Sequence, residues 1–207
     1  MRTRLKICGI RRMEDVQYLN EALPDFAGFI CAEGYWRYVP PETLRDLSAA
    51  LDPRIARVGV FVDSTPEEIE RFAPYLDVLQ LHGAEGAAYI EALHGRFPHH
   101  RLWKAVRVRT AQDIADADAL PVEALVLDSF SHAAHGGTGT LAPWDIIAKH
   151  RPEKPFLLAG GITPENVQRA VREVQPWGVD ASSSLETDRC KDGDKITALV
   201  RAVRNDS

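Results

Sequence analysis

The 207-residue sequence has few cysteines and no arrangement of them that would build a disulfide framework or a zinc site. Cys8, Cys31 and Cys190 are widely separated, odd in number and form no C-x-x-C pair, which favours a reducing compartment. None of the seven histidines falls in an H-E-x-x-H or H-x-H pattern. No metal centre is therefore expected.

The sequence also lacks long apolar runs and blocks of basic residues. No run approaches the length of a membrane span, and the interrupted apolar stretch after residues 1–4 is too short for a signal peptide, so we expect a cytoplasmic protein. The net charge is −5, and neither nucleic acid nor an anionic membrane surface is expected as a partner. A small anionic ligand is compatible with this charge, because backbone amides and one or two arginines suffice to bind it.

No Pro/Gly/Ser-rich linker or low-complexity tract interrupts the chain, so residues 1–207 are expected to form one domain. Short apolar runs alternate with amphipathic or capped helical segments, eight of each. The runs are centred on Leu5 to Cys8, Phe26 to Cys31, Ile55 to Val62, Val78 to Leu81, Leu102 to Val106, Ala124 to Leu127, Pro155 to Ala159 and Gly178 to Ala181. The helices are expected to begin near Met13, Pro41, Pro66, Gly86, Ala111, Pro143, Pro164 and Asp192. Thr65-Pro66-Glu67-Glu68 carries the cap, first-turn Pro and Glu of a capping box, which supports this alternation.

Repeated strand and helix units with near-continuous apolar strands indicate an α/β protein with a parallel sheet covered by helices. Eight units close naturally into a (β/α)8 TIM barrel. The chain allows about 26 residues for each unit, against ~250 for a typical whole barrel, so the loops must be brief. A doubly wound open sheet of similar length is the structural alternative.

A phosphate-binding turn is predicted at residues 157–167, where an apolar run stops at Gly160 and Gly161 and a helix follows. The two glycines let the backbone approach a ligand closely. Thr163 is expected to be the N-cap, with Pro164 at the first helical position, so that free N–H groups face an anion. The alternative is a tight strand-to-helix turn without a ligand, since double glycines end many strands.

Polar side chains stand at the ends of several apolar runs, where a barrel gathers its functional residues. Because strand side chains alternate, Lys6 and Cys8 share one face of the first run. Leu5 and Ile7 share the other face, and if they contact the helices, Cys8 points into the barrel mouth. A lone cysteine is more often an inert core residue, so that alternative stays open.

The fourth and sixth runs end in the same way. Gln80 and His82 share one face of the fourth run. Burying two polar side chains there costs free energy unless they are hydrogen-bonded or bind a ligand. Asp128 ends the sixth run, where it serves either as a general acid or as a cap of the following loop.

Three consecutive strand ends are rich in Gly or Ser: Gly136-Gly137-Thr138-Gly139, Gly160-Gly161 and Ser182-Ser183-Ser184. Barrels commonly build a phosphate site from the loops after their last strands, with backbone N–H groups facing the anion. The convergence of these segments favours phosphate binding at residues 157–167 over a plain turn.

An ordered set of segments across nearly the whole chain resembles the phosphoribosylanthranilate isomerase family. The segments are Lys6-Ile7-Cys8-Gly9, Arg37-Tyr38-Val39, Val58-Gly59-Val60-Phe61-Val62, Leu79-Gln80-Leu81-His82-Gly83, Asp128, Gly136-Gly137-Thr138-Gly139, Leu158-Ala159-Gly160-Gly161-Ile162, Asn166-Val167, Asp180 and Lys191-Asp192. The resemblance implies a (β/α)8 barrel that catalyses the Amadori rearrangement of N-(5'-phosphoribosyl)anthranilate in tryptophan biosynthesis. It also implies that no cofactor or metal is needed, and a monomer or homodimer is expected.

The resemblance also implies residue roles. Cys8 is expected to be the general base that removes the proton from C2 of the sugar, and Asp128 the general acid that protonates the ring oxygen. Arg37 is expected to hold the anthranilate carboxylate. The other residues expected at the substrate are Gln80, His82, Gly137, Gly139, Gly160, Gly161, Asp180, Ser182 and Ser183. Because the thiolate is the active form of a cysteine, Lys6 on the same face is a candidate cation to favour it.

Three segments depart from the family pattern. Tyr35 stands where the family usually has Ser, and Asp188-Arg189 replaces Pro-Gly. Ser184 replaces a Gly after the eighth strand, which would be strained if the backbone there has a positive φ. All three lie near expected substrate contacts.

Three rival functions fit parts of the pattern. The histidine-pathway aminoaldose isomerase performs the same rearrangement but carries Asp where Cys8 stands. Indole-glycerol-phosphate synthase uses Lys and Glu at strand ends, and here Lys104 is the only obvious lysine while no Glu ends a strand. A barrel that binds a phosphorylated ligand without turning it over would leave Cys8 and Asp128 idle.

Overall fold

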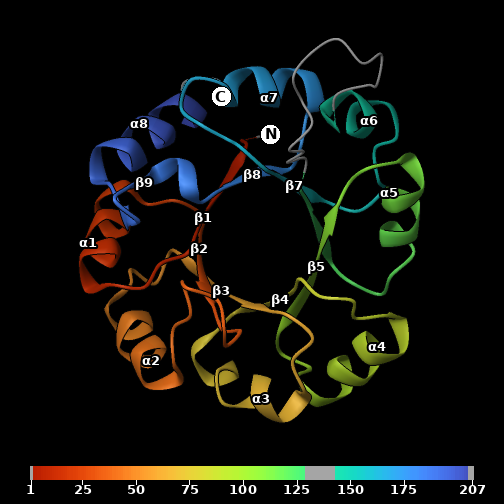
Figure 1. Ribbon diagram of the computed structural model, residues 1–207, viewed down its shortest axis with the longest axis horizontal. Coiled ribbons are helices and arrows are strands. Elements are labelled where there is room, and N and C mark those ends of the chain that lie inside the picture. Colours follow the sequence, from red (N-terminus) through yellow and green to blue (C-terminus); the bar gives the residue numbers. More distant parts are fainter. Residues whose placement is uncertain (1, 129–142, 205–207) are drawn as a thin grey trace.

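Eight parallel strands close into a barrel in the computed structural model, which describes residues 2–128 and 143–204 (Figure 1). The strands are β1 (Arg4–Cys8), β2 (Phe26–Ile30), β3 (Ala56–Phe61), β4 (Val78–Leu81), β5 (Arg101–Arg107), β6 (Ala124–Asp128), β7 (Phe156–Ala159) and β8 (Gly178–Ala181). Each strand pairs with the next in chain order, and β8 pairs with β1, which closes the ring. The predicted (β/α)8 barrel is confirmed, and the doubly wound open sheet is wrong.

Helices surround the ring on its outer side (Figure 1). They are α1 (Met13–Ala22), α2 (Pro41–Ala50), α3 (Pro66–Glu70), α4 (Ala87–Arg96), α5 (Ala111–Asp118), α6 (Pro143–Lys149), α7 (Val167–Val174) and α8 (Gly193–Arg204), with 3-10 turns η1 (Ala73–Tyr75) and η2 (Ser183–Leu185). The predicted capping box at α3 is present, because Thr65 Oγ1 accepts from Glu68 N and the Glu68 carboxylate accepts from Thr65 N. None of the helices within the described residues is long and apolar enough to cross a membrane.

The predicted start of α7 was wrong: the helix begins at Val167, three residues after Pro164. A turn held by side chains precedes it. Thr163 N donates to Asn166 Oδ1 at 2.9 Å, and Asn166 Nδ2 donates to the Gly161 carbonyl at 2.7 Å. Side-chain hydrogen bonds of this kind compete with helix formation, so Thr163 is the first residue of this turn and not the N-cap.

The core has two parts that follow the alternation along the strands. The larger cluster fills the layer between strands and helices and includes Leu5 and Ile7. The smaller cluster fills the inside of the ring: Phe26, Val58, Val78, Trp103, Ala105, Ala124, Val126 and Leu157, with Trp177 packed against them. Phe26 and Trp103 meet edge to face at 5.0 Å between ring centroids. These large rings come from the starts and middles of strands, so they fill the ring below the C-terminal ends of the strands.

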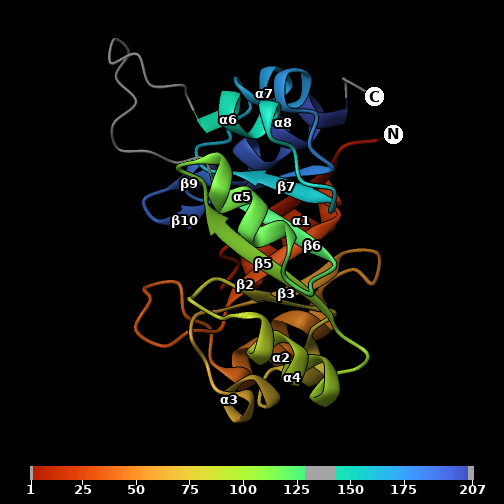
Figure 2. The ribbon, with the colours of Figure 1, turned by 90° about the vertical axis from the view of Figure 1, so that its right-hand side faces the viewer.

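A two-stranded hairpin stands apart from the barrel sheet. Its strands β9 (Glu186–Thr187) and β10 (Cys190–Lys191) pair antiparallel, with Asp188 and Arg189 as the turn between them. Figure 2 shows this hairpin at the left-hand end of the molecule and the N-terminus at the right. The hairpin therefore lies at the end of the barrel toward which the strands run.

Candidate active site

The C-terminal ends of the barrel strands surround a cavity of about 380 Å³. Every predicted site residue in the described part of the chain lines it: Cys8, Arg37, Gln80, His82, Asp128, Gly160, Gly161, Asp180, Ser182 and Ser183. The predicted Gly137 and Gly139 lie outside the described residues. A separate cavity of about 740 Å³ lies at the starts of the strands, beside Arg4 and Trp177, and contains none of the predicted residues.

Cys8 lies at the end of β1 with 8% of its surface exposed, on the inner face of the ring. It packs closely over β2, since a β-carbon at Gly28 would lie 2.7 Å from Cys8 Sγ. Cys31 behaves differently: its thiol donates to the Phe29 carbonyl in the core, and burial raises the pKa of Cys31. Of the three thiols, Cys8 is the one that lines the cavity, as the strand alternation predicts.

Lys6 lies beside Cys8 on the same face and is completely buried. Its Nζ donates to Asp180 Oδ2 at 2.8 Å. Burial alone would lower the pKa of Lys6, but attraction to Asp180 and to Cys8 raises it overall, so Lys6 stays a cation. The second oxygen, Asp180 Oδ1, is buried and has no hydrogen-bond partner among the described residues.

Gln80 and His82 come from the end of β4 and the residue after it, as predicted. Gln80 is 2% exposed, and its Oε1 accepts no hydrogen bond within the described part of the chain. Desolvation at the cavity wall, together with the charge of Lys6, lowers the pKa of His82, so its ring is neutral at neutral pH. Unsatisfied buried acceptors beside a cavity are sites where a ligand hydroxyl can donate.

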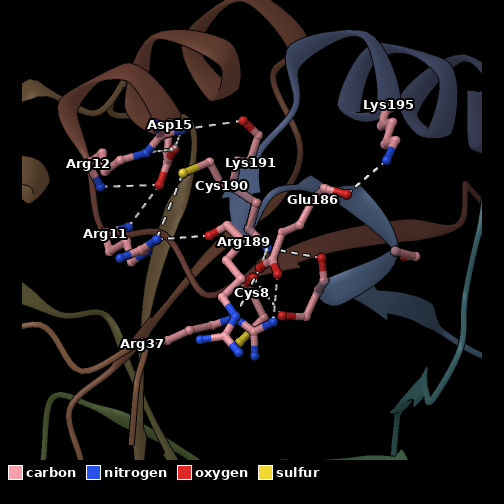
Figure 3. Close-up of polar contacts among 12 residues, drawn as sticks. Cys8, Arg11, Arg12, Asp15, Arg37, Glu186, Arg189, Cys190, Lys191 and Lys195 are labelled. Atoms are coloured by element: carbon pink, nitrogen blue, oxygen red, sulfur yellow. Dashed lines mark hydrogen bonds and ion pairs between the residues drawn. The ribbon is translucent and has the colours of Figure 1, made fainter.

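Arg37 comes from the loop between β2 and α2, and its guanidinium is held by the hairpin (Figure 3). Arg37 Nε and Nη2 donate to the two carboxylate oxygens of Glu186 at 2.9 and 2.7 Å. Lys191 Nζ donates to the same carboxylate at 2.8 Å. Burial opposes ionisation of Glu186, but these hydrogen bonds hold its pKa below the usual value. Gly9 makes the approach possible, because a β-carbon there would lie 2.7 Å from Arg37 Cδ.

The expected phosphate end is formed by the turn after β7 and by η2. Gly160 and Gly161 have φ values of 90° and 70°, a region that only glycine adopts at little cost. Ser184 does not have a positive φ, so the loss of the family's glycine causes no strain there. Its hydroxyl instead donates to the Ile162 carbonyl and ties the two loops together. Ser182 Oγ donates to the Cys8 carbonyl at 3.0 Å.

Lys104, the lysine that a lyase of the indole-glycerol-phosphate synthase type would need, points away from the cavity. It shares a strand face with Leu102, which packs toward the helices, while Trp103 fills the ring. Lys104 Nζ is paired with Glu85 Oε2 at 2.9 Å, and both side chains are buried. Nor does the described part of the chain contain a group of three or more His, Cys, Asp or Glu residues that could hold a metal ion.

Two residues at this site were not predicted as contacts: Glu186, which holds Arg37, and Trp36, whose ring lies 4.0 Å from the Arg37 guanidinium carbon. Neither stands at the end of a barrel strand. Glu186 is separated from Arg37 by 149 residues, and the two-residue strand that carries it shows no periodicity. The role of Glu186 therefore cannot be predicted from spacing along the sequence.

A closed parallel barrel, with a cavity at the C-terminal ends of its strands into which polar side chains converge, defines a (β/α)8-barrel enzyme. Over residues 5–202 the chain matches the family model described as N-(5'phosphoribosyl)anthranilate (PRA) isomerase. The chain therefore belongs to the N-(5'-phosphoribosyl)anthranilate isomerase family, the aldose–ketose isomerases of tryptophan biosynthesis.

Individual relatives agree with this family over the full length. The N-(5'-phosphoribosyl)anthranilate isomerase of Acetivibrio thermocellus is 42% identical, over 98% of this chain and 96% of its own. A solved phosphoribosyl anthranilate isomerase from Thermotoga maritima is 34% identical with a TM-score of 0.84, covering 98% of this chain and 99% of its own. Another solved isomerase, 33% identical with a TM-score of 0.84 and the same coverage, is in complex with reduced 1-(o-carboxyphenylamino)-1-deoxyribulose 5-phosphate. The family predicted from the sequence is confirmed.

Proposed function

We propose that Cys8 and Asp128 carry out the proton transfers that convert N-(5'-phosphoribosyl)anthranilate to 1-(o-carboxyphenylamino)-1-deoxyribulose 5-phosphate. Asp128 gives a proton to the ring oxygen, and the lone pair of the anthranilate nitrogen displaces this oxygen from C1. The sugar ring opens and an iminium remains at C1. The Cys8 thiolate then removes the proton from C2 and gives an enol-amine. Gain of a proton at C1 and loss of one from the C2 hydroxyl complete the ketone.

The observation that carries this proposal is the placement of Cys8 and Asp128 at the wall of one cavity, from β1 and β6. A base and an acid must act on neighbouring atoms of one sugar, so they must share one site. The buried cation of Lys6 beside Cys8 supports the role of the thiolate.

We assign the substrate's two anionic ends to different residues of the cavity wall. The Gly160-Gly161 turn and the η2 loop would hold the phosphate through backbone amides. Arg37 would hold the aromatic carboxylate. The buried acceptors Gln80 Oε1 and Asp180 Oδ1 would accept hydrogen bonds from the sugar hydroxyls between them.

The test is an assay of N-(5'-phosphoribosyl)anthranilate consumption by the purified protein and its variants. Turnover by the parent enzyme, lost on replacement of Cys8 or Asp128, is the expected outcome. A barrel that binds a phosphorylated ligand without chemistry would bind the reduced product analogue but consume no substrate. Rescue of a tryptophan-requiring strain tests the same activity in cells.

We further propose that residues 1–207 act as one catalytic domain in the cytoplasm, without a metal or cofactor. A monomer or a homodimer is expected. One solved relative, from Thermotoga maritima, is described as a monomeric form of a dimeric isomerase. Sedimentation velocity of this protein at micromolar and lower concentrations decides between the two states.

A further inference from the structure

Three guanidinium groups surround the exposed indole ring of Trp36, the residue before Arg37 in the loop after β2. The guanidinium carbons of Arg37, Arg11 and Arg189 lie 4.0, 5.2 and 5.6 Å from the ring centroid. All three distances are within the range of cation–π attraction. Trp36 itself is 46% exposed, so the ring is a platform on the surface and not a core residue.

Positive charge is in surplus at this platform, although the whole chain carries a net charge of −5. Arg37 is paired with Glu186 through two hydrogen bonds. Within the described residues no carboxylate lies within 4.0 Å of the guanidinium groups of Arg11 or Arg189. Like charges gathered in one place repel one another and attract an anion.

Arg189 occupies this place at a conformational cost. Asp188 and Arg189 have φ values of 50° and 61°, both in the left-handed region, as a tight two-residue hairpin turn requires. Glycine is the preferred residue at the second position of such a turn. A residue outside the hairpin holds the turn in place, because Arg11 Nη2 donates to the Arg189 carbonyl at 2.8 Å. Residues held in sparsely populated conformations cluster at ligand-binding sites.

The side chains of Arg189 and Arg37 reach the Trp36 ring from different elements, and of these two arginines Arg37 is the one that lines the cavity. Figure 3 shows Arg189 extending from the hairpin toward the region of Arg37 and Cys8. Arg37 uses Nε and Nη2 on Glu186, which leaves one side of its guanidinium for a second carboxylate. The Glu186 carboxylate is also paired with Lys191 Nζ at 2.8 Å, so its negative charge is shared between two cations. Arg189 would add a cation that has no carboxylate partner within 4.0 Å among the described residues.

We infer that Arg189, stacked on Trp36, is a specificity-determining residue that provides the second cation for the aromatic carboxylate of the substrate. Arg37 and Arg189 would then share that carboxylate, each contacting one oxygen. The inference rests on the proposed function, because it takes the carboxylate to lie at Arg37. It accounts for the departure at Arg189 together with the contact of its side chain with Trp36.

The experiment measures binding of two ligands to the full-length protein by isothermal titration calorimetry. One ligand is reduced 1-(o-carboxyphenylamino)-1-deoxyribulose 5-phosphate, and the other is the same molecule with a phenyl group in place of the carboxyphenyl group. The variant Arg189→Gly removes the guanidinium and relieves the backbone at this turn. The matched control Asp188→Gly relieves the neighbouring left-handed residue and keeps Arg189.

Arg189→Gly is expected to weaken the carboxylated ligand about tenfold and the phenyl ligand less than about twofold, as loss of one charged contact to the carboxylate predicts. Asp188→Gly should leave both dissociation constants unchanged, and Arg189→Lys should recover part of the lost affinity at low salt. Equal weakening of both ligands by Arg189→Gly, or no weakening, overturns the inference. If the parent protein bound the two ligands equally well, the proposed placement of the substrate carboxylate at Arg37 would also be wrong.

Discussion

The Lys6 ammonium lies 2.8 Å from Asp180 Oδ2 inside the barrel, and the other oxygen of Asp180 has no partner among the described residues. The Lys6 side chain is wholly buried, and that of Asp180 is 10% exposed. This arrangement fixes a positive charge beneath Cys8 while it leaves a buried acceptor at the cavity wall. One ion pair thus supports both the proposed base and the proposed sugar contact.

Replacement of Lys6 by Met should lower both stability and activity. The Asp180 carboxylate is left buried without its cation, which typically costs about 3–5 kcal/mol of unfolding free energy. The Cys8 thiolate loses a neighbouring cation, so kcat should fall. Urea denaturation measures the first effect and steady-state kinetics at neutral pH the second.

The double variant Lys6→Met/Asp180→Leu separates the two effects. Replacing both partners of a buried ion pair by apolar groups of similar size leaves no uncompensated charge, so most of the lost stability should return. The lost activity should not return, because the cation is still absent. A kcat of Lys6→Met equal to that of the parent would contradict a role of Lys6 at Cys8.

Glu186→Gln should weaken substrate binding more than it slows the chemistry. The amide keeps the shape of the side chain but loses the charged hydrogen bonds that hold Arg37 and Lys191. We expect KM to rise about tenfold, with kcat within about threefold of the parent value. The matched control is Glu67→Gln, which also removes a partner of an arginine, Arg96, but on the exposed surface. A larger loss in kcat than in KM would contradict the positioning role.

The same carboxylate predicts a pH dependence of stability. The pKa of Glu186 is held below its usual value of 4.5 in the folded protein, so the unfolded chain binds more protons between the two values. The stability from this group is present above about pH 4.5 and is lost as the pH falls through the lowered folded pKa. The stability difference between the parent and Glu186→Gln should therefore shrink from neutral pH to about pH 4, as urea midpoints at several pH values would show. A stability difference between the parent and Glu186→Gln that grows as the pH falls would contradict this prediction.

Gly161→Ala tests the backbone of the expected phosphate end. No atom of the described residues lies within 4 Å of the position of an added β-carbon, so the cost of this change is that of the left-handed conformation, about 1–2 kcal/mol. Gly95→Ala is the matched control, because Gly95 lies in α4 with equally open space. There alanine should stabilise the protein by about 0.5–1 kcal/mol. Thermal or urea denaturation should therefore show that Gly161→Ala lowers the stability and Gly95→Ala raises it. Equal stability changes in the two variants would contradict the explanation.

The barrel and the inward direction of Cys8 could be predicted because both follow from local patterns. Leu5 and Ile7 pack toward the helices, and the two-residue period of a strand then turns Lys6 and Cys8 inward. The same period also predicts that Lys104 points outward, since Trp103 fills the ring. What the sequence predicts well is therefore the set of contacts that one strand and its covering helix determine.

The contacts that hold Arg37 could not be predicted in this way. They join a loop after β2 to a hairpin after β8, and strand periodicity fixes neither. The turn at Asp188-Arg189 lacks the Asn-Gly or Asp-Gly signal of a two-residue hairpin. The start of α7 was misplaced because Asn166 competes for the backbone groups of the first turn. Such features depend on distant partners and on side-chain hydrogen bonds.

The most direct test of the account is the steady-state rate of N-(5'-phosphoribosyl)anthranilate isomerisation by Cys8→Ser and Asp128→Asn. Both changes nearly preserve shape, so folding and binding of the reduced product analogue should be retained. Each should lower kcat by about 10²–10⁴, with a much smaller change in KM, as loss of a general base or acid predicts. A variant that lacks either side chain and keeps a kcat close to that of the parent would contradict the assignment of the two proton transfers.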